Sequence, residues 1–333
     1  MAQGLIQKPK IHFVNYKKQY IQFSKDVVLP LQMQPWWLDI VCEGGVWDVC
    51  LHFNGEGEIV GALPFFIRKK YFLQISTMPP LTDYIGIFIK IPENGMLKDV
   101  TKRTVEQKIM TELVKQLQPV HYFNQQYYPE TINWLPFYWQ GYKQTVYYTF
   151  CFENQAIETI YAGFKRTVWT DIKKAEKSVE CIVSSELNDF YAINRQSFKR
   201  NGVNIPYQKS TLEALDSELL QRNQRQILIA KDKINGDIHA ALYWVWDDET
   251  AYFLLSGVAD KYKNSAAVHL LYWQAIQQAM EMGKKVDFCG SMLPKVEHIL
   301  RSYGATPVPH FRVFKAKNRF WLNLFSLLNK FDL

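Results

Sequence analysis

The sequence predicts an α/β protein, α+β in detail, that contains two similar halves. Residues 57–67 (GEIVGALPFFI) resemble residues 236–246 (GDIHAALYWVW): both read glycine, acid, isoleucine, any residue, small residue, alanine, leucine. Each stretch follows a strand-like run and a polar turn, the pattern of the second strand of a β-hairpin. The same kinds of element then follow in the same order. The sequence therefore predicts a tandem duplication, with mixed β-sheets flanked by helices.

Each half continues with a third strand, a helix and a fourth strand. The expected third strands are 84–90 and 251–259, the helices 104–117 and 265–283, and the fourth strands 120–128 and 285–290. The second helix is the better marked, because Ser265 can cap its start and Gly283 can end it. A basic helix over 165–177, a strand and two further helices are expected between the halves.

The length and composition suit two domains, which we place at residues 1–154 and 155–316. The chain has 333 residues and a net charge of +7, compatible with a phosphate-bearing partner or an anionic membrane. Five scattered cysteines without C-x-x-C spacing indicate reduced thiols in a cytoplasmic protein. No secretory signal, membrane span, metal site or tightly bound cofactor is expected.

The last segment, residues 317–333, is predicted to be an amphipathic helix. Basic residues flank one wide apolar face made of Phe320, Trp321, Leu324, Phe325, Leu327, Leu328 and Phe331. Such a face either packs back onto the protein, the commoner use, or lies in a membrane interface.

The motifs of common hydrolases, P-loop proteins and dinucleotide-binding proteins are missing from the sequence. The helix that starts at Ser265 offers a different chemistry, because unpaired amides at a helix start bind anions. Lys261, Lys263 and Asn264 precede that start. The alternative is a solvated basic loop.

Several stretches resemble the Fem-type (FemAB-like) aminoacyltransferases, in which the GNAT (acyl-CoA N-acyltransferase) fold occurs twice. The resemblance covers roughly residues 30 to 315 and is most specific in the second half. The matching residues are Arg166, Ile172, Lys173, Lys174 and Ala175, the run Trp273, Ala275, Ile276, Ala279, Gly283, Asp287, Phe288 and Gly290, the pair Tyr303-Gly304, and the stretches QPWWL and TDYIG in the first half.

The resemblance implies an enzyme that transfers an aminoacyl or acyl group from an activated donor to an amine of a cell-envelope precursor, of peptidoglycan or polysaccharide. Such transfer needs a positioned, deprotonated amine and oxyanion stabilisation, and no covalent enzyme intermediate. Acyl-CoA or aminoacyl-tRNA would be the co-substrate. The implied setting is a bacterial cytoplasm, with peripheral contact to the inner membrane through the C-terminal helix.

The resemblance also suggests which residues form the site. We expect Asp287, Ser291 and Arg301 at the reacting centre, Lys261, Lys263, Asn264 and Ser265 at the donor, and Arg166, Lys173, Lys174, Asp83 and Tyr84 at the acceptor and its phosphate. Asp287 would orient the amine or accept its proton, or else cap the turn at Gly290.

Two departures from the family keep other functions open. The stretch from Lys261 to Ala266 lacks the glycines that cradle CoA pyrophosphate, and no long heptad segment provides a tRNA-binding arm. One alternative is an acyl-CoA-dependent N-acetyltransferase of a small amine. The other is a degenerate, non-catalytic GNAT-fold protein that binds a membrane-linked glycolipid or a partner protein. The expected acceptor is lipid- or UDP-linked, and use of tRNA stays open.

Overall fold

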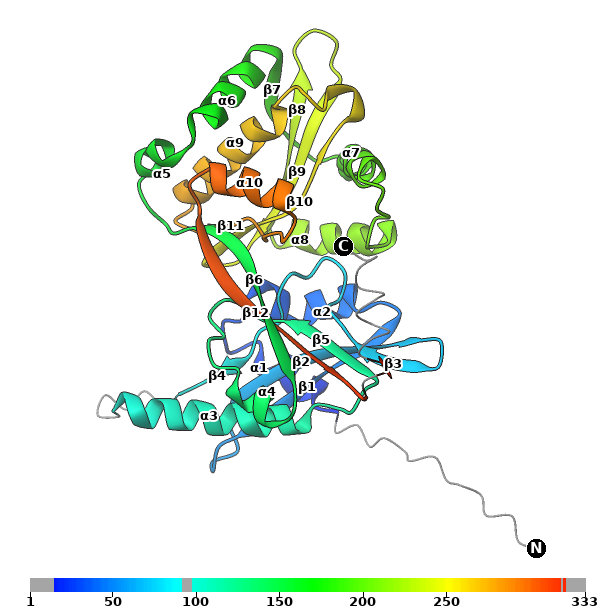
Figure 1. Cartoon of the computed structure of the whole chain (residues 1–333), viewed down its shortest axis with the longest axis vertical. Coiled ribbons are helices and arrows are strands. Elements are labelled where there is room, and N and C mark those ends of the chain that lie inside the picture. The colour runs from blue at the N-terminus through cyan, green and yellow to red at the C-terminus, as the bar shows by residue number, and fades with distance from the viewer. Residues whose placement is uncertain (1–14, 92–97, 319, 322–333) are drawn as a thin grey trace, which may run out of the picture.

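The computed structural model describes residues 15–91, 98–318 and 320–321 (Figure 1). The first half of the chain forms one lobe and most of the second half forms the other. The elements of the first half are α1 (Lys17–Phe23), η1 (Leu31–Met33), α2 (Pro35–Val41), β1 (Gly45–Phe53), β2 (Ile59–Lys70), β3 (Leu73–Ser76), β4 (Phe88–Ile89), α3 (Asp99–Gln116), β5 (Tyr122–Gln126), α4 (Leu135–Trp139) and β6 (Lys143–Phe152).

The second half begins with two helices. Its elements are α5 (Ile157–Gly163), α6 (Arg166–Ser178), β7 (Val179–Ser184), α7 (Leu187–Arg200), α8 (Lys209–Gln221), β8 (Arg225–Asp232), β9 (Ile238–Trp246), β10 (Thr250–Val258), η2 (Asp260–Tyr262), α9 (Ala267–Glu281), β11 (Lys285–Asp287), α10 (Pro294–Ser302) and β12 (Thr306–Ala316). In the described ranges no helix is long and apolar enough to cross a bilayer.

The predicted duplication is confirmed by the strand pairing. In the first half β1 pairs with β2 and β2 with β3, both antiparallel, and β3 pairs with β5 in parallel after the crossover helix α3. In the second half β8, β9, β10 and β11 pair in the same way around α9. The two halves therefore have one topology and place their crossover helices in equivalent positions.

The two repeated hairpins also use the same turn chemistry. The Oδ1 atom of Asn54 accepts hydrogen bonds from the amides two and four residues later, and that of Asp232 from the amides two and three residues later. Gly57 and Gly236 then take positive φ angles of 83° and 75°. Asn and Asp favour such turns because their side chains replace backbone partners. The repeated sequence pattern thus encodes a repeated turn.

The predicted third strand of the first half, at 84–90, is wrong. The third strand is β3, and β4 is a two-residue strand that pairs with the opposite end of β2. The intervening segment instead fills the space between the halves, where Tyr84 and Ile85 are buried. An apolar run in a core segment has the same composition as a buried strand, so the sequence alone does not separate them.

The last strands of the two halves are exchanged. Twelve strands of the described chain form one sheet, in the order β1-β2-β3-β5-β12-β6-β11-β10-β9-β8-β7, with β4 beside β2. Strand β12, from the end of the chain, pairs with β5 of the first half, and β6 of the first half pairs with β11 of the second. The two strands cross between the lobes as a pair (Figure 1).

A core shared by both halves lies beside this crossing. Buried aromatic residues of the first half, among them Trp37 and Tyr84, belong to the same apolar cluster as Tyr243 and Tyr252 of the second half. The parallel ladder between β10 and β11 ends at Tyr252 and Asp287, while β10 continues to Val258. Strand β11 therefore ends at the junction of the halves, and its last residue, Asp287, lies where the candidate site is found.

Candidate active site

A cavity of about 770 Å³ lies between the two halves. Its apolar wall comes from the first half and includes Met33, Ile87, Phe88 and Met110. Its polar wall comes from the turn between β9 and β10, from β11 and from the ends of β5 and β6. A concave space with one apolar side and a few charged groups is the usual form of a small-molecule site.

The charged groups that line this cavity are almost all acidic. They are Glu106, Glu130, Glu153, Asp247, Asp248, Glu249 and Asp287. Lys285 is the lining base, and its ammonium pairs with Glu130 at 2.9 Å. Lys284 adds a positive charge close by, because its Nζ atom donates to the main-chain oxygens of Asp247 and Asp248. The cavity thus carries negative charge in a chain whose total is +7.

Asp287 is a buried lining carboxylate whose hydrogen bonds all fall on one oxygen. It is 4% exposed, and its Oδ1 atom accepts hydrogen bonds from Thr149 Oγ1 at 2.5 Å, the Cys289 amide at 2.7 Å and the Tyr84 hydroxyl at 3.4 Å. In the part of the chain that the structure describes, its Oδ2 atom accepts no hydrogen bond. One oxygen therefore fixes the carboxyl group and the other is available to a ligand.

The first half contributes the partner of this carboxylate. Gln32 is fully buried, and its Oε1 atom accepts hydrogen bonds from the amides of Asp83 and Tyr84 at 2.7 and 2.9 Å. That contact turns the Tyr84 side chain toward Asp287, and the Gln32 side-chain amide lies 3.5 Å from Asp83 Oδ2. A side chain of the N-terminal segment thus positions a hydroxyl that reaches the C-terminal half.

Burial raises the pKa values of the Asp287 and Asp83 carboxyl groups toward 7. It raises the pKa of Asp287 to about 6, against the hydrogen bonds from Thr149, Cys289 and Tyr84. It raises the pKa of Asp83 to about 7, and the nearby charge of Asp287 contributes to that rise. A carboxylate of this kind can take a proton from an amine near pH 7.

The turn after Asp287 explains the Gly-Ser sequence that follows β11. Cys289 and Gly290 take positive φ angles of 56° and 53°. A Cβ atom on Gly290 would lie 2.4 Å from the main-chain oxygen of Tyr148, so only glycine fits against β6. The close approach is to a neighbouring strand rather than to a ligand. Burial raises the pKa of the Cys289 thiol, so this thiol stays protonated and is a poor nucleophile.

The other two residues expected at the reacting centre lie elsewhere. Ser291 Oγ accepts a hydrogen bond from the Leu293 amide at 3.1 Å, which organises the start of α10. Arg301 is exposed on α10 and pairs with Glu297 at 2.8 Å. Neither lines the cavity. Of the three, the structure brings only Asp287 to the cavity.

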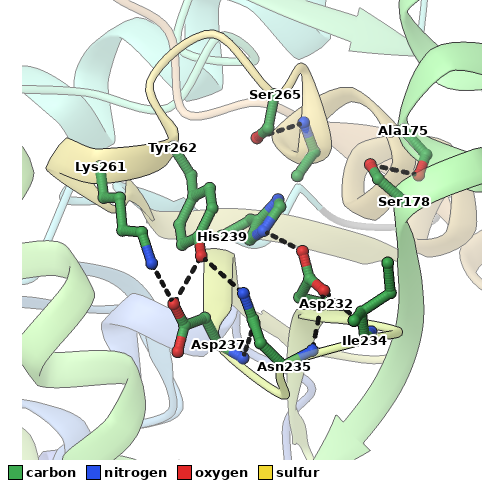
Figure 2. Close-up of polar contacts among 11 residues, drawn as sticks. Ala175, Ser178, Asp232, Ile234, Asn235, Asp237, His239, Lys261, Tyr262 and Ser265 are labelled. Carbon is green, nitrogen blue, oxygen red and sulfur yellow. Dashed lines mark hydrogen bonds and ion pairs between the residues drawn. The ribbon is translucent and has the colours of Figure 1, made fainter.

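The expected donor loop before α9 is partly occupied by internal contacts. Lys261 Nζ and the Tyr262 hydroxyl both contact Asp237 Oδ2, at 2.8 and 2.5 Å, and both side chains point away from Ser265 (Figure 2). Tyr262 stacks on His239, with ring centroids 3.6 Å apart. Lys261 is therefore neutralised by a carboxylate of the β8–β9 turn and does not reach the helix start.

The helix start itself keeps a polar surface. Helix α9 begins after Ala266, which has a φ angle of 61° and takes the cap position expected for Ser265, and Ser265 Oγ lies 3.4 Å from the Ala267 amide. Lys263 and Asn264 are exposed, and the ammonium of Lys174 from α6 donates to the Asn264 main-chain oxygen at 2.9 Å. Helix α6, whose bases were expected to bind phosphate, is therefore in direct contact with the expected donor loop.

The basic face of α6 lies apart from the residues expected to share its role. Arg166, Lys173 and Lys174 are exposed on α6, a helix at the outer side of the second lobe (Figure 1). Asp83 and Tyr84 lie at the junction of the halves beside another carboxyl group, where a phosphate would be repelled. The five residues do not form one acceptor site.

The sequence did not predict the roles of Thr149 and Gln32, nor the group of seven lining carboxylates, which we call the acidic wall. Thr149 alternates inward on β6, but its contact with Asp287 depends on the exchange of strands. Gln32 is a polar residue in an apolar stretch, which is a weak signal for a buried hydrogen-bonding role. The carboxylates of the wall come from five separate segments of the chain, so no local pattern marks them.

Comparisons with known proteins agree with this arrangement. A family model described as an acetyltransferase (GNAT) domain matches residues 162–294, from α5 to the start of α10. The chain is an acyltransferase by virtue of this GNAT domain, as the sequence predicted. A search of curated proteins finds no significant match.

Solved structures extend the GNAT likeness over most of the chain. FemX has a TM-score of 0.61 at 10% identity, with 89% of this chain and 95% of FemX covered. L-PGS from Bacillus licheniformis has a TM-score of 0.56 at 10% identity, with coverages of 95% and 97%. The C-terminal domain of a putative lysylphosphatidylglycerol synthetase from Agrobacterium fabrum gives 0.55 at 8%, with 94% and 96%. At such identities the likeness establishes the fold.

Proposed function

We propose that the protein transfers an acyl group from acyl-CoA to the amine of a positively charged acceptor that binds between the two halves. The observation that carries this proposal is the geometry of Asp287. Its Oδ1 atom is held by Thr149, Cys289 and Tyr84, while Oδ2 is left for a ligand of the cavity. The GNAT domain supports acyl-CoA as the donor.

The chemistry assigns a proton acceptor and no nucleophile to the protein. The acceptor arrives as an ammonium ion, and the Asp287 carboxylate takes its proton, since the pKa of about 6 leaves the carboxyl ionised at neutral pH. The amine nitrogen attacks the thioester carbonyl carbon and a C–N bond forms. The C–S bond then breaks, the thiolate leaves with the second proton lost by the attacking nitrogen, and Asp287 releases the first proton to solvent. The Tyr84 hydroxyl stays protonated, because burial raises its pKa, and keeps the base in place.

The acidic wall supports a cationic acceptor. Several carboxylates and one lysine line the cavity, so a cation gains Coulomb energy there and a phosphate loses it. This charge favours a diamine, a polyamine or a lysine-bearing peptide. The apolar wall with Met33 and Phe88 suits the alkyl chain of such a molecule.

A cell-envelope precursor that carries phosphate is the second candidate acceptor. The exposed bases of α6 favour it, because Lys174 contacts the loop before α9 and Arg166 and Lys173 lie on the same helix. Such an acceptor would place its pyrophosphate on α6 and only its amine toward the cavity.

The test measures thiol release from acetyl-CoA by the purified full chain, with spermidine, cadaverine, lysyl peptides and a UDP-linked muropeptide as acceptors. We expect turnover with the cationic amines and a loss of roughly 10²- to 10⁴-fold in kcat for Asp287→Asn. Asp189→Asn, on the exposed start of α7, is the matched control. The proposal fails if no amine supports turnover or if Asp287→Asn is as active as the wild type.

A further inference from the structure

The tip of the β2–β3 hairpin exposes two large aromatic side chains. Tyr71 is 89% exposed and Phe72 is 79% exposed, and they form the two-residue connection between the paired residues Lys70 and Leu73. Tyr71 has a φ angle of 57°. Asn and Gly are the residues that favour such a turn, and an aromatic residue there is strained. The tip is therefore poorly explained by the needs of the turn.

The aromatic tip continues into the end of the described chain. Trp321 packs on Leu73 and Ile75, and its ring centroid lies 6.2 Å from that of Phe72. The neighbouring Phe320 is 66% exposed. The tip and residues 320–321 thus form one surface, from which the sequence continues with LNLFSLLNKFDL. The predicted helix over 317–333 lies largely outside the described residues.

Basic residues surround the aromatic tip. Arg68, Lys69 and Lys70 are consecutive and exposed at the end of β2, and Lys317 is exposed after β12. Among the described residues none of these four forms an ion pair. No acidic residue occurs between Glu58 and Asp83, so the charge of the hairpin is positive throughout.

We propose that the aromatic tip (Tyr71 and Phe72), together with Phe320 and the bases at 68–70, docks the protein on an anionic membrane surface. Aromatic rings with polar or charged neighbours partition to the lipid headgroup region, and lysine and arginine are attracted to the anionic lipids there. The unpaired positive charge favours a lipid surface over a second copy of this chain, whose own tip carries the same charge. This docking does not depend on the proposed acyl transfer.

Vesicle flotation of the full chain tests the aromatic part of the proposal. With vesicles of phosphatidylglycerol and phosphatidylcholine, we expect the wild type to float and the double variant Tyr71→Ser/Phe72→Ser to lose at least about 10-fold in partition coefficient. The control Val183→Ser/Ile234→Ser removes two exposed apolar side chains from the other lobe and should float like the wild type. Equal melting curves by circular dichroism show that the variants are folded.

The charged part is tested on the same vesicles. Lys69→Gln/Lys70→Gln should bind anionic vesicles several-fold more weakly, and the binding of the wild type should fall with salt. Lys18→Gln/Lys25→Gln removes the same charge from α1 and its end, and should bind as the wild type does. The proposal is overturned if the wild type does not float with anionic vesicles. It is also overturned if the tip variants float equally well, or if sedimentation shows a dimer that the Tyr71/Phe72 variant dissociates.

Discussion

The hydroxyl of Tyr84 lies 3.4 Å from Oδ1 of Asp287, although 203 residues separate them in the chain. The contact joins the two halves at the wall of the cavity, and both residues are buried. A base supplied by one half is thereby oriented by the other. The candidate site exists only when the halves are assembled, and four predictions follow from its geometry.

Thr149 is expected to set the pH at which the enzyme works. As a base, Asp287 is active when ionised, so kcat should rise with pH through about 6. The Thr149 hydrogen bond lowers the pKa of Asp287. Thr149→Val should therefore move the rising limb of the kcat–pH profile to higher pH and cost more activity at pH 6 than at pH 8. Thr145→Val, exposed on the same strand, is the control. An unchanged limb in Thr149→Val would show that Asp287 is not the titrating group.

Asp83→Asn is expected to alter the pH dependence of stability. The pKa of Asp83 is about 7 in the folded chain against an ordinary value of 3.8, so the folded state binds the proton more tightly. Stability from this group is present below pH 4 and is lost as pH rises through 7. The variant avoids that loss, so its melting temperature relative to wild type should increase between pH 5 and pH 8. Thermal melts across this range check it, and a constant difference would contradict it.

Gly290→Ala should be strongly destabilising. The substitution adds the strain of a positive φ and a contact of 2.4 Å with the Tyr148 oxygen, and we expect a cost of more than about 2 kcal/mol. Gly55→Ala is the matched control, because nothing lies within 4 Å of its added Cβ and its φ is not in the positive range. Urea unfolding of both variants measures the difference. Equal stability would mean that β6 can move away from the turn.

The carboxylates of the acidic wall should act on binding more than on turnover. Asp248→Asn and Glu249→Gln are each expected to raise KM for a diamine by roughly 2- to 5-fold with little change in kcat, as for partly exposed charge pairs. Added salt should raise the wild-type KM in the same direction. Glu180→Gln, exposed on β7, is the control. An equal or larger effect on a monoamine, which carries one positive charge instead of two, would argue against a charge role.

The fold could be predicted because its signals are local. The helical spacing of apolar residues marks α9, and the Asn and Asp turns mark the two hairpins. The third strand of the first half was missed because residues 84–90 are apolar for a different reason, the filling of a core between the halves. Register and strand exchange are properties of the assembled sheet and leave no local pattern.

The site was predictable only where one stretch of chain carries it. Asp287 ends a buried strand and precedes a Gly-Ser turn, a pattern that suggests a functional strand end. Ser291 and Arg301 were chosen for chemical type and proximity in sequence, but the geometry of α10 turns them to local roles. The acidic wall and Thr149 meet Asp287 through tertiary structure alone. Whether the donor residues Lys263, Asn264 and Ser265 bind a ligand stays a prediction.

The exchange of β6 and β12 has a consequence for how the protein is made. Strand β5 can pair with β3 early, but it acquires its second neighbour only when residues 312–316 have emerged from the ribosome, so one edge of the N-terminal sheet stays open until nearly the whole polypeptide is made. Pairings of such long sequence separation form slowly, and the waiting edge is open to aggregation. Nascent chains truncated before β12 should therefore depend on chaperones, and the two lobes should not be obtainable as separately expressed fragments.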